Sequence, residues 1–330
     1  MFAFVFAFVF PTVFAPVCVA QDLRAIPGPW DNRTAVLTGR GDDGADLTMH
    51  YLVAGPANAP AVVLLHGFPD FSYGWRYVIP LLSEEFRVYA PDLRGYAGTD
   101  APRRGYDIDV LAGDILAFLD VIGPVDGRDP AAPVHLIGHD WGATVGWRAV
   151  NDTPERFSSW TPLDVPHMRT LVAYLHESRE QRKYRRFLVQ LLAPLAPTIL
   201  AGLGPERRAQ LAYREELVHD GALRDEDIAW YQAAWDERRE VIGPLRYYRR
   251  IVYHRGPVER YYEDAPKISV PTLVLWGAED HYMLSPMAER SCTEVSARCA
   301  SEVFQGAGHY LHWDQPEGVV RSWRAFIAGE

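Results

Sequence analysis

Short, continuously apolar runs alternate with helical patterns along most of this chain. The apolar runs end at Gly, Pro or polar residues, as expected for strands covered on both faces; they are Ala61–Leu65, Phe86–Ala90, Val134–Ile137, Trp160–Leu163, Ile268–Trp276 and Ser301–Phe304. Helical spacing of apolar residues predicts helices over Ile108–Ile122, Gly142–Val150 and Val319–Ile327. This alternation predicts an α/β protein with a mostly parallel sheet.

The pattern is different near the start of the chain. Thr34–Thr38 and Leu47–Ala54 are rich in residues that favour strands, and the turn at 39–44 between them is rich in Gly and Asp. This arrangement is typical of a β-hairpin.

Strand patterns are missing between about Asp164 and Asp264. This stretch has a helical pattern, is rich in Arg, Tyr and Leu, and is interrupted by pairs such as Gly243-Pro244. The simplest interpretation is a helical insertion between two halves of one sheet. We predict a core formed by residues 21–163 and 265–330, with a helical cap at residues 164–264.

The first 20 residues contain no charged side chain, and Pro11 and Pro16 interrupt their apolar run. The run ends at Cys18-Val19-Ala20, whose small residues suit the cleavage site of a signal peptide. We predict a signal peptide at residues 1–20 and a secreted or periplasmic protein, although no Lys or Arg stands near Met1. A misassigned start codon is the alternative, and the protein would then be cytoplasmic. The two prolines disfavour a permanent membrane span.

Composition narrows the classes of function. The chain has 330 residues with 48% apolar content, which is enough for a large core, and its net charge is −10. That charge offers no electrostatic basis for binding nucleic acid. Cys292 and Cys299, with six residues between them, form either a disulfide or two unpaired thiols. No spacing predicts a zinc or haem site, and we expect no metal or cofactor.

The candidate chemistry centres on Asp140. It lies in the sequence GHDWG at 138–142, between a predicted strand and a predicted helix. This is the context of a nucleophile elbow, whose usual pattern is G-x-S-x-G. A carboxylate in the serine position is a poor acyl acceptor, but it can displace a leaving group at saturated carbon and form an ester on the enzyme. The aspartate therefore disfavours an esterase or lipase.

Hydrolysis of such an ester requires a base and a group that orients it. Asp280 follows the predicted strand that ends at Trp276, and His309 follows the one that ends at Phe304. Nucleophile, acid and histidine thus occur in a known chain order, each in a loop after a strand, where parallel sheets form ligand sites. We expect His309 to be neutral and Asp140 to be ionised at the working pH.

Two other residues are alternatives for the orienting acid, and two histidines flank the proposed acid and base. Glu279 is an alternative orienting acid, and so is Asp164, which follows the predicted strand Trp160–Leu163. His281 and His312 flank the proposed acid and base, and we expect them to support the site or to lie at the surface.

The ester step also requires donors for a developing oxyanion. We expect the backbone N–H groups of Trp141, after the nucleophile, and of Phe68, in the sequence HGFP at 66–69, to supply them. Loss of one such donor typically costs about 3 kcal/mol. A cis peptide bond at Pro69 would turn this loop inward. Phe68, Pro69 and Trp141 are expected to line the substrate site.

Together these motifs resemble the epoxide hydrolase group of the α/β-hydrolases. Residues 66–69 (HGFP) are similar to its HGxP loop, residues 92–96 (DLRGY) to its DLRGY turn, residues 138–142 to its elbow, and residues 308–317 to the surroundings of its catalytic histidine. The resemblance covers residues 45–164 and 265–330. It implies the α/β-hydrolase fold, with a mostly parallel sheet of the eight-stranded type, flanking helices and an inserted helical cap.

The resemblance also implies cap tyrosines that donate hydrogen bonds to the epoxide oxygen. Tyr248 lies in the run LRYYR, which is similar to the motif that carries one of them. Tyr184 is the nearest candidate for the other, although its spacing to Gln190 is one residue longer than the family pattern. A neutral hydroxyl suits this role because it can donate to the oxygen as it becomes an alkoxide.

Haloalkane dehalogenases share the aspartate and the following tryptophan, whose indole N–H binds halide in that group, so Trp141 does not discriminate. Phe68 lacks the side-chain donor that usually accompanies that tryptophan, which favours epoxides. We therefore predict hydrolysis of a small-molecule epoxide to a vicinal diol through an aspartyl ester, by a monomer or a homodimer. A haloalkane dehalogenase is the first alternative, and a non-catalytic secreted binding protein is the second.

Overall fold

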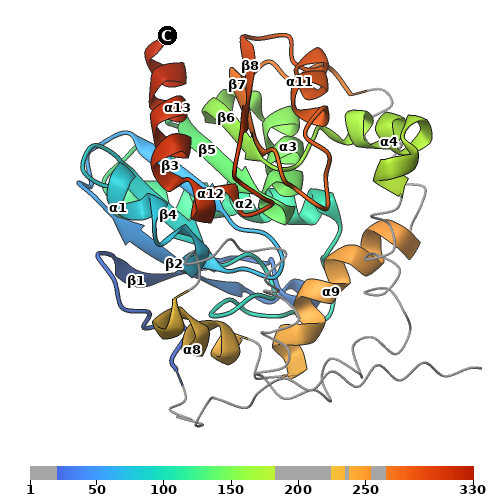
Figure 1. The fold of residues 1–330 in the computed structure, drawn as a ribbon. Helices are drawn as coiled ribbons and strands as arrows, with labels where there is room; N and C mark the ends of the chain where they lie inside the picture. The colour runs from blue at the N-terminus through green and yellow to red at the C-terminus, as the bar shows by residue number, and fades with distance from the viewer. Residues whose placement is uncertain (1–20, 183–223, 235–237, 254–264) are drawn as a thin grey trace, which may run out of the picture.

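The computed structural model describes residues 21–182, 224–234, 238–253 and 265–330 (Figure 1). Within these ranges one eight-stranded sheet has the order β1-β2-β4-β3-β5-β6-β7-β8. Its strands are β1 (Asp31–Leu37), β2 (Leu47–Ala54), β3 (Ala61–Leu65), β4 (Arg87–Pro91), β5 (Val134–His139), β6 (Phe157–Leu163), β7 (Thr272–Gly277) and β8 (Cys299–Phe304). The predicted α/β class is confirmed.

The sheet is mostly parallel. β1 pairs with β2 and β2 with β4 in antiparallel fashion, whereas every ladder from β4 through β3 to β8 is parallel. The predicted hairpin is therefore confirmed. The predicted strand Ile268–Trp276 is too long at its start: β7 begins at Thr272, and Ile268 forms only an isolated bridge with Val295. Pro271 has no N–H to offer a ladder, which explains the break.

Helices cover both faces of the sheet. In the described ranges they are α1 (Val78–Leu82), α2 (Ile108–Val125), α3 (Trp141–Asp152), α4 (Met168–Glu177), α8 (Asp225–Ala234), α9 (Arg238–Tyr253), α11 (Met287–Ser291), α12 (Leu311–Asp314) and α13 (Pro316–Ala328). α2 and α3 pack together on one face, and α1 and α13 pack together on the other (Figure 1). β3 and β7 are buried along their whole length, which is why their sequences are continuously apolar.

The chain between β6 and β7, called here the β6–β7 segment, contains α4, α8 and α9 in its described part. Figure 1 shows α8 and α9 at the bottom of the view, below the sheet, and the C terminus at the top. The cap boundaries at residues 164 and 264 stay a prediction. Tyr184 lies in 183–223 and the predicted signal peptide in 1–20, so both fall outside the described residues.

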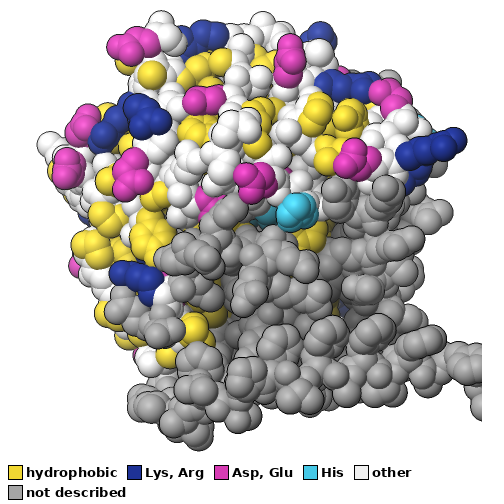
Figure 2. All heavy atoms as spheres, in the orientation of Figure 1, with side chains coloured by type: hydrophobic (Ala, Val, Ile, Leu, Met, Phe, Trp, Pro, Cys, Tyr) yellow, Lys and Arg dark blue, Asp and Glu magenta, His cyan; other side chains and the backbone are white. Residues whose placement is uncertain are grey.

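The described surface is of mixed charge. Figure 2 shows acidic and basic side chains interspersed among hydrophobic ones on the described part of one face. Among the residues that the structure describes, none of the helices combines the length and the apolar character needed to span a bilayer.

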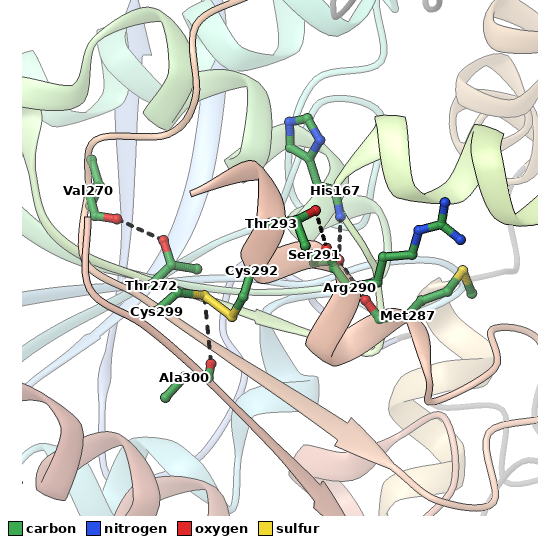
Figure 3. Close-up of a disulfide and its surroundings, with 10 residues drawn as sticks. All are labelled: His167, Val270, Thr272, Met287, Arg290, Ser291, Cys292, Thr293, Cys299 and Ala300. Carbon is green, nitrogen blue, oxygen red and sulfur yellow. Dashed lines mark hydrogen bonds between the residues drawn. A yellow bond between two sulfur atoms is a disulfide. The ribbon is translucent and has the colours of Figure 1, made fainter. Parts of the chain in front are cut away.

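Cys292 and Cys299 form a disulfide, with their Cα atoms 5.6 Å apart (Figure 3). Cys292 begins the short 3-10 turn η4 (Cys292–Glu294), and Cys299 begins the edge strand β8. The bond therefore ties the start of the last strand to the end of α11. Beside it, the backbone N–H of His167 donates to Ser291 Oγ at 3.1 Å, which joins the start of the β6–β7 segment to α11.

Replacing Cys292 and Cys299 with Ser is expected to lower the free energy of unfolding by about 2 kcal/mol, because even a short closed loop restricts the unfolded chain. Urea unfolding of the double variant and of the wild type, each with and without a reductant, measures this difference. The reductant should destabilise the wild type alone. Equal stability of all four samples would show that the bond does not form in solution.

Stability is also expected to depend on pH through buried histidines. Burial lowers the pKa of His135 and of His167 to about 4. Between pH 6.5 and 4 the unfolded chain binds protons at these residues and the folded chain does not, so stability falls as the pH falls. We expect a loss of about 2 kcal/mol per histidine between pH 7 and pH 5.

Urea unfolding at both pH values tests this expectation in the wild type and in His135→Gln, whose pH dependence should be weaker. The comparison with the variant is needed because burial raises the pKa of Asp70 to about 6. Asp70 therefore makes stability rise as the pH falls, which opposes the effect of the histidines. If His135→Gln loses as much stability between pH 7 and pH 5 as the wild type does, His135 does not contribute to the pH dependence.

Candidate active site

Asp140 lies at the turn between β5 and α3, with φ +48° and ψ −117°. A positive φ is uncommon for a residue with a side chain, and it presents the carboxylate at the tip of the turn. The structure leaves no room for a side chain at the two glycines of the GHDWG sequence, Gly138 and Gly142. A Cβ atom on Gly142 would lie 2.2 Å from the carbonyl oxygen of Leu65, and one on Gly138 would lie 2.8 Å from the carbonyl carbon of Gly142. The GHDWG sequence therefore suits a nucleophile elbow.

The structure brings Asp140, His309 and Asp280 together. His309 Nδ1 lies 2.9 Å from Asp280 Oδ2, and His309 Nε2 lies 3.7 Å from Asp140 Oδ2. Asp280 is held in turn by its other oxygen, which accepts hydrogen bonds from the backbone N–H groups of Tyr282 at 2.6 Å and Met283 at 3.0 Å. This is the geometry of a nucleophile, a base and an orienting acid.

These three residues form a charge network. Burial would lower the pKa of His309, but the charges of Asp280 and Asp140 outweigh it and raise that pKa well above its usual value. Burial would raise the pKa of Asp140, but contact with His309 and its charge hold it below the usual value. The two carboxylates therefore favour the protonated form of His309 while both are charged. The neutral His309 expected from the sequence stays a prediction, and loss of one of those negative charges would favour it.

The HGFP loop supplies a hydrogen-bond donor to Asp140. The backbone N–H of Phe68 donates to Asp140 Oδ1 at 2.6 Å, and the Phe68-Pro69 peptide bond is cis, as predicted. Asp140 Oδ1 is therefore held at a donor, while Oδ2 faces His309. Trp141 begins α3 directly after the nucleophile, which places its N–H at the N-terminus of that helix.

Replacing Gly67 with Ala is expected to lower turnover about 100-fold, because small displacements of reacting groups have effects of this size. A Cβ atom there would lie 2.3 Å from Asp140 Cβ and 2.5 Å from Asp140 Oδ1. Steady-state kinetics on folded protein measures the effect. The control is Gly127→Ala, where φ is +68° and nothing lies within 4 Å of the new Cβ. Similar turnover in the two variants would mean that Gly67 has no special role.

Tyr248 brings a hydroxyl-bearing side chain from α9 to this site. Its ring packs edge-on against Phe68 and Trp141, with centroid distances of 5.2 and 5.0 Å. Burial raises the pKa of Tyr248 well above its usual value, and the charge of Asp140 raises it further. The hydroxyl is therefore neutral near pH 7 and keeps its proton for donation.

The alternatives for the acid differ in their surroundings. Glu279 is exposed, as is His281, whereas Asp280 is buried against His309. Asp164 is fully buried, and its Oδ1 accepts a hydrogen bond from the N–H of Gly277 at 2.7 Å. Burial and the charge of Asp280 raise the pKa of Asp164 well above its usual value, which favours the neutral carboxyl. This environment favours Asp280 as the orienting acid.

Three histidine rings meet around the proposed base. His139, which the motif analysis left without a role, donates from Nε2 to the carbonyl oxygen of His309 at 2.6 Å. His312 is fully buried, and its ring lies 4.5 Å from that of His139. The ring of Tyr282, which was also not predicted, packs edge-on against His309 at 5.1 Å. The only sequence signal for these contacts is proximity to Asp140, Asp280 or His309.

In the part of the chain that the structure describes, no cluster of three or more His, Cys, Asp or Glu side chains is suited to hold a metal ion.

The sequence and the fold match those of a known class. Residues 62–322 match the Alpha/beta hydrolase family. The chain therefore belongs to the alpha/beta hydrolase family, as its motifs implied, and it is a hydrolase.

Within this family the chain is similar to epoxide hydrolases. It is 30% identical over 290 residues to Epoxide hydrolase 4 of Homo sapiens, and the match covers 86% of this chain and 76% of that protein. The structure of epoxide hydrolase VrEH1 from Vigna radiata is similar with a TM-score of 0.74 and 26% identity, covering 92% of this chain and 99% of that one. A putative acyltransferase from Salmonella enterica has a TM-score of 0.76 at 24% identity, covering 94% and 98%. The fold alone therefore does not decide the reaction.

Proposed function

We propose that the protein hydrolyses small epoxides to vicinal diols through an ester on Asp140. The observation that carries this proposal is the position of Tyr248, whose ring packs against both Phe68 and Trp141 beside the nucleophile. A neutral phenol there can protonate the oxygen that an opened epoxide leaves behind. Similarity to Epoxide hydrolase 4 supports the same substrate class.

In the first step Asp140 Oδ2 attacks one epoxide carbon. Its partner Oδ1 is engaged by the N–H of Phe68, so Oδ2 is the oxygen that can bond to the substrate. The carbon–oxygen bond of the epoxide breaks as the new ester bond forms. Tyr248 gives its proton to the departing oxygen, which becomes the first hydroxyl of the diol.

The second step begins with a change of charge. Esterification removes the negative charge of Asp140, which is one of the two charges that raise the pKa of His309. The imidazolium ion then loses its proton, which reprotonates the phenolate that Tyr248 became in the first step. Neutral His309, oriented by Asp280, takes a proton from water, and the hydroxide attacks the ester carbonyl. The N–H groups of Phe68 and Trp141 stabilise the resulting oxyanion. When it collapses, the ester bond breaks and the departing alkoxide takes the proton of the new Asp140 carboxyl, which gives the diol and restores the carboxylate beside the His309 imidazolium.

Isotope labelling tests the ester directly. With enzyme in excess over a styrene oxide substrate in ¹⁸O-labelled water, one turnover should place the label in the peptide that contains Asp140 and leave the diol unlabelled. Labelled diol and an unlabelled peptide would instead show direct attack by water and would end the ester proposal.

Dehalogenation is the alternative reaction, and a panel of substrates distinguishes it from epoxide hydrolysis. Phe68 offers no side-chain donor for halide beside the indole of Trp141. We expect diol from styrene oxide and from short alkyl epoxides, little halide from 1-bromobutane, and background activity on p-nitrophenyl esters. Halide release without diol would support a dehalogenase, and no turnover on any of these would support a binding protein.

We also propose that the protein is exported to an oxidising compartment. The disulfide between Cys292 and Cys299 and the uncharged N-terminal 20 residues support this, because disulfides persist mainly outside the cytosol. Cell fractionation with mass analysis of the N terminus tests it. A full-length chain found in the cytosol with two alkylatable thiols at these positions would contradict export.

A further inference from the structure

A second buried polar cluster joins α8 to the chain that follows the HGFP loop. We call it the Arg76 cluster; its members are Asp70, Tyr73, Arg76, Asp227 and Tyr231. Asp227 and Tyr231 are 0% exposed, and Arg76 is 5% exposed. Charges buried to this degree are tolerated only when they are paired and hydrogen-bonded.

The charged members are paired across the two elements. Arg76 Nη2 lies 3.3 Å from Asp227 Oδ2, and the hydroxyl of Tyr73 donates to Asp227 Oδ1 at 2.6 Å. The guanidinium of Arg76 also lies 4.5 Å from the centre of the Trp313 ring, a cation–π contact with the segment that follows His309. Asp227 therefore anchors α8 to the core at a single register.

Tyr231 extends the cluster to the HGFP loop. Its hydroxyl donates to Asp70 Oδ1 at 3.1 Å and accepts from Arg76 Nη1 at 3.1 Å. Asp70 directly follows the cis peptide bond between Phe68 and Pro69. The oxygen of Asp70 that receives Tyr231 also accepts from the N–H of Phe71 at 2.8 Å. One hydroxyl thus contacts the carboxylate of Asp70, the last residue of the turn that carries Phe68.

A backbone hydrogen bond also holds this turn. The N–H of Asp70 donates to the carbonyl oxygen of Gly67 at 3.0 Å, so residues 67–70 form a closed turn. Phe68 lies inside it, and its N–H reaches Asp140 Oδ1 at 2.6 Å. A shift of α8 would therefore reach Asp140 through Tyr231, Asp70 and Phe68.

Apolar side chains could hold α8 with similar stability, because replacing buried ion pairs by well-packed hydrophobic residues is often neutral or stabilising. A polar cluster, however, specifies one position of the helix, since its hydrogen bonds are lost when the helix slides. α9, which carries Tyr248, begins at Arg238, shortly after α8 ends at Ala234. We therefore expect the position of α8 to affect the positions of both the Phe68 N–H and the Tyr248 hydroxyl.

We infer that Tyr231 and Arg76 are positioning residues that dock α8 onto the turn at residues 67–70 and so fix the N–H of Phe68 at the nucleophile. For its effect on catalysis this inference rests on the proposed ester mechanism. The cluster acts chiefly on ester hydrolysis, because that is the step in which an oxyanion needs the Phe68 donor.

Tyr231→Phe tests the inference with the smallest change. It keeps the ring, which packs edge-on against Phe71 at 5.2 Å, and removes only the hydroxyl. Ester hydrolysis is expected to slow about tenfold, since a modest misplacement of a catalytic group has effects of this order. Intact-protein mass spectrometry during turnover of styrene oxide should then show a larger fraction of ester than in the wild type.

The matched control is Tyr89→Phe. Tyr89 is also buried, and its hydroxyl donates to Asp126 Oδ2 at 2.5 Å, next to Arg87. It belongs to a similar Tyr–Asp–Arg cluster with no contact to the HGFP loop among the described residues. If both variants lose stability equally and neither accumulates ester, the Arg76 cluster is only structural and the inference is wrong. Should Tyr231→Phe fail to fold, Tyr73→Phe, which removes the bond to Asp227, gives the same readout.

Hydrogen exchange separates failure of this inference from failure of the proposed reaction, because it needs no substrate. In Tyr231→Phe, exchange should rise together at α8 and at residues 67–71. A rise confined to α8, with unchanged exchange at 67–71, would overturn the inference. Absence of diol from the wild type would overturn the proposed reaction, and the exchange result would still decide whether the cluster couples the two elements.

Discussion

His309→Gln is expected to stop the reaction after the first step, so that one substrate molecule remains attached to Asp140. Glutamine has no basic nitrogen to take a proton from water, and ester hydrolysis should slow about 10³-fold or more. Attack by Asp140 Oδ2 does not require a base. The ester should therefore form and then persist.

Intact-protein mass spectrometry measures this result as an added mass equal to one epoxide. His281→Gln is the matched control, because His281 is the exposed neighbour of Asp280. That variant should turn over like the wild type and carry no stable adduct. An unmodified His309→Gln protein, under conditions where the wild type makes diol, would refute the covalent mechanism.

Tyr248→Phe is expected to slow the first step by about 100-fold or more, which is the usual contribution of a general acid. The ring contacts with Phe68 and Trp141 do not need the hydroxyl, so the fold should be kept. Hydrolysis of an ester already formed should change little, because His309 and Asp280 carry out that step.

The first step is best measured in the His309→Gln background, where the rate of adduct formation reports on it alone. Tyr247→Phe is the control: Tyr247 lies next in the chain, and its hydroxyl donates to the carbonyl oxygen of Arg94 at 2.8 Å. Adduct formation should be slow only with Tyr248→Phe. Equal rates in both double variants would remove Tyr248 as the proton donor and would direct attention to Trp141 and halide substrates.

Most of the strands could be predicted from the sequence because each has a local pattern of apolar residues. A strand covered on both faces must be apolar throughout, and Ala61–Leu65 was predicted with the bounds that the structure shows. The meeting of Asp140, Asp280 and His309 could also be predicted, because each follows a strand and the carboxyl ends of parallel strands share one edge.

The Arg76 cluster could not be predicted, because no local pattern links its halves. Tyr231 and Asp70 are 161 residues apart, and an aspartate in a loop or a tyrosine on a helix is usually explained by solvent or packing. The raised pKa of His309 could not be predicted either. It depends on how closely two carboxylates approach one ring, which spacing along the chain does not reveal.

The sheet and the β6–β7 segment contribute different groups to the candidate site. The two steps of the proposed reaction therefore depend on different parts of the chain. Asp140, Asp280, His309 and Phe68 all follow strands of the sheet, whereas Tyr248 comes from α9 in the segment. In the proposed mechanism, changes in the sequence of the β6–β7 segment can therefore alter which bond is opened, while the residues that hydrolyse the ester stay the same. Grafting a relative's segment onto this sheet would transplant substrate preference as a unit, provided that the grafted α8 still meets Asp70 and Arg76.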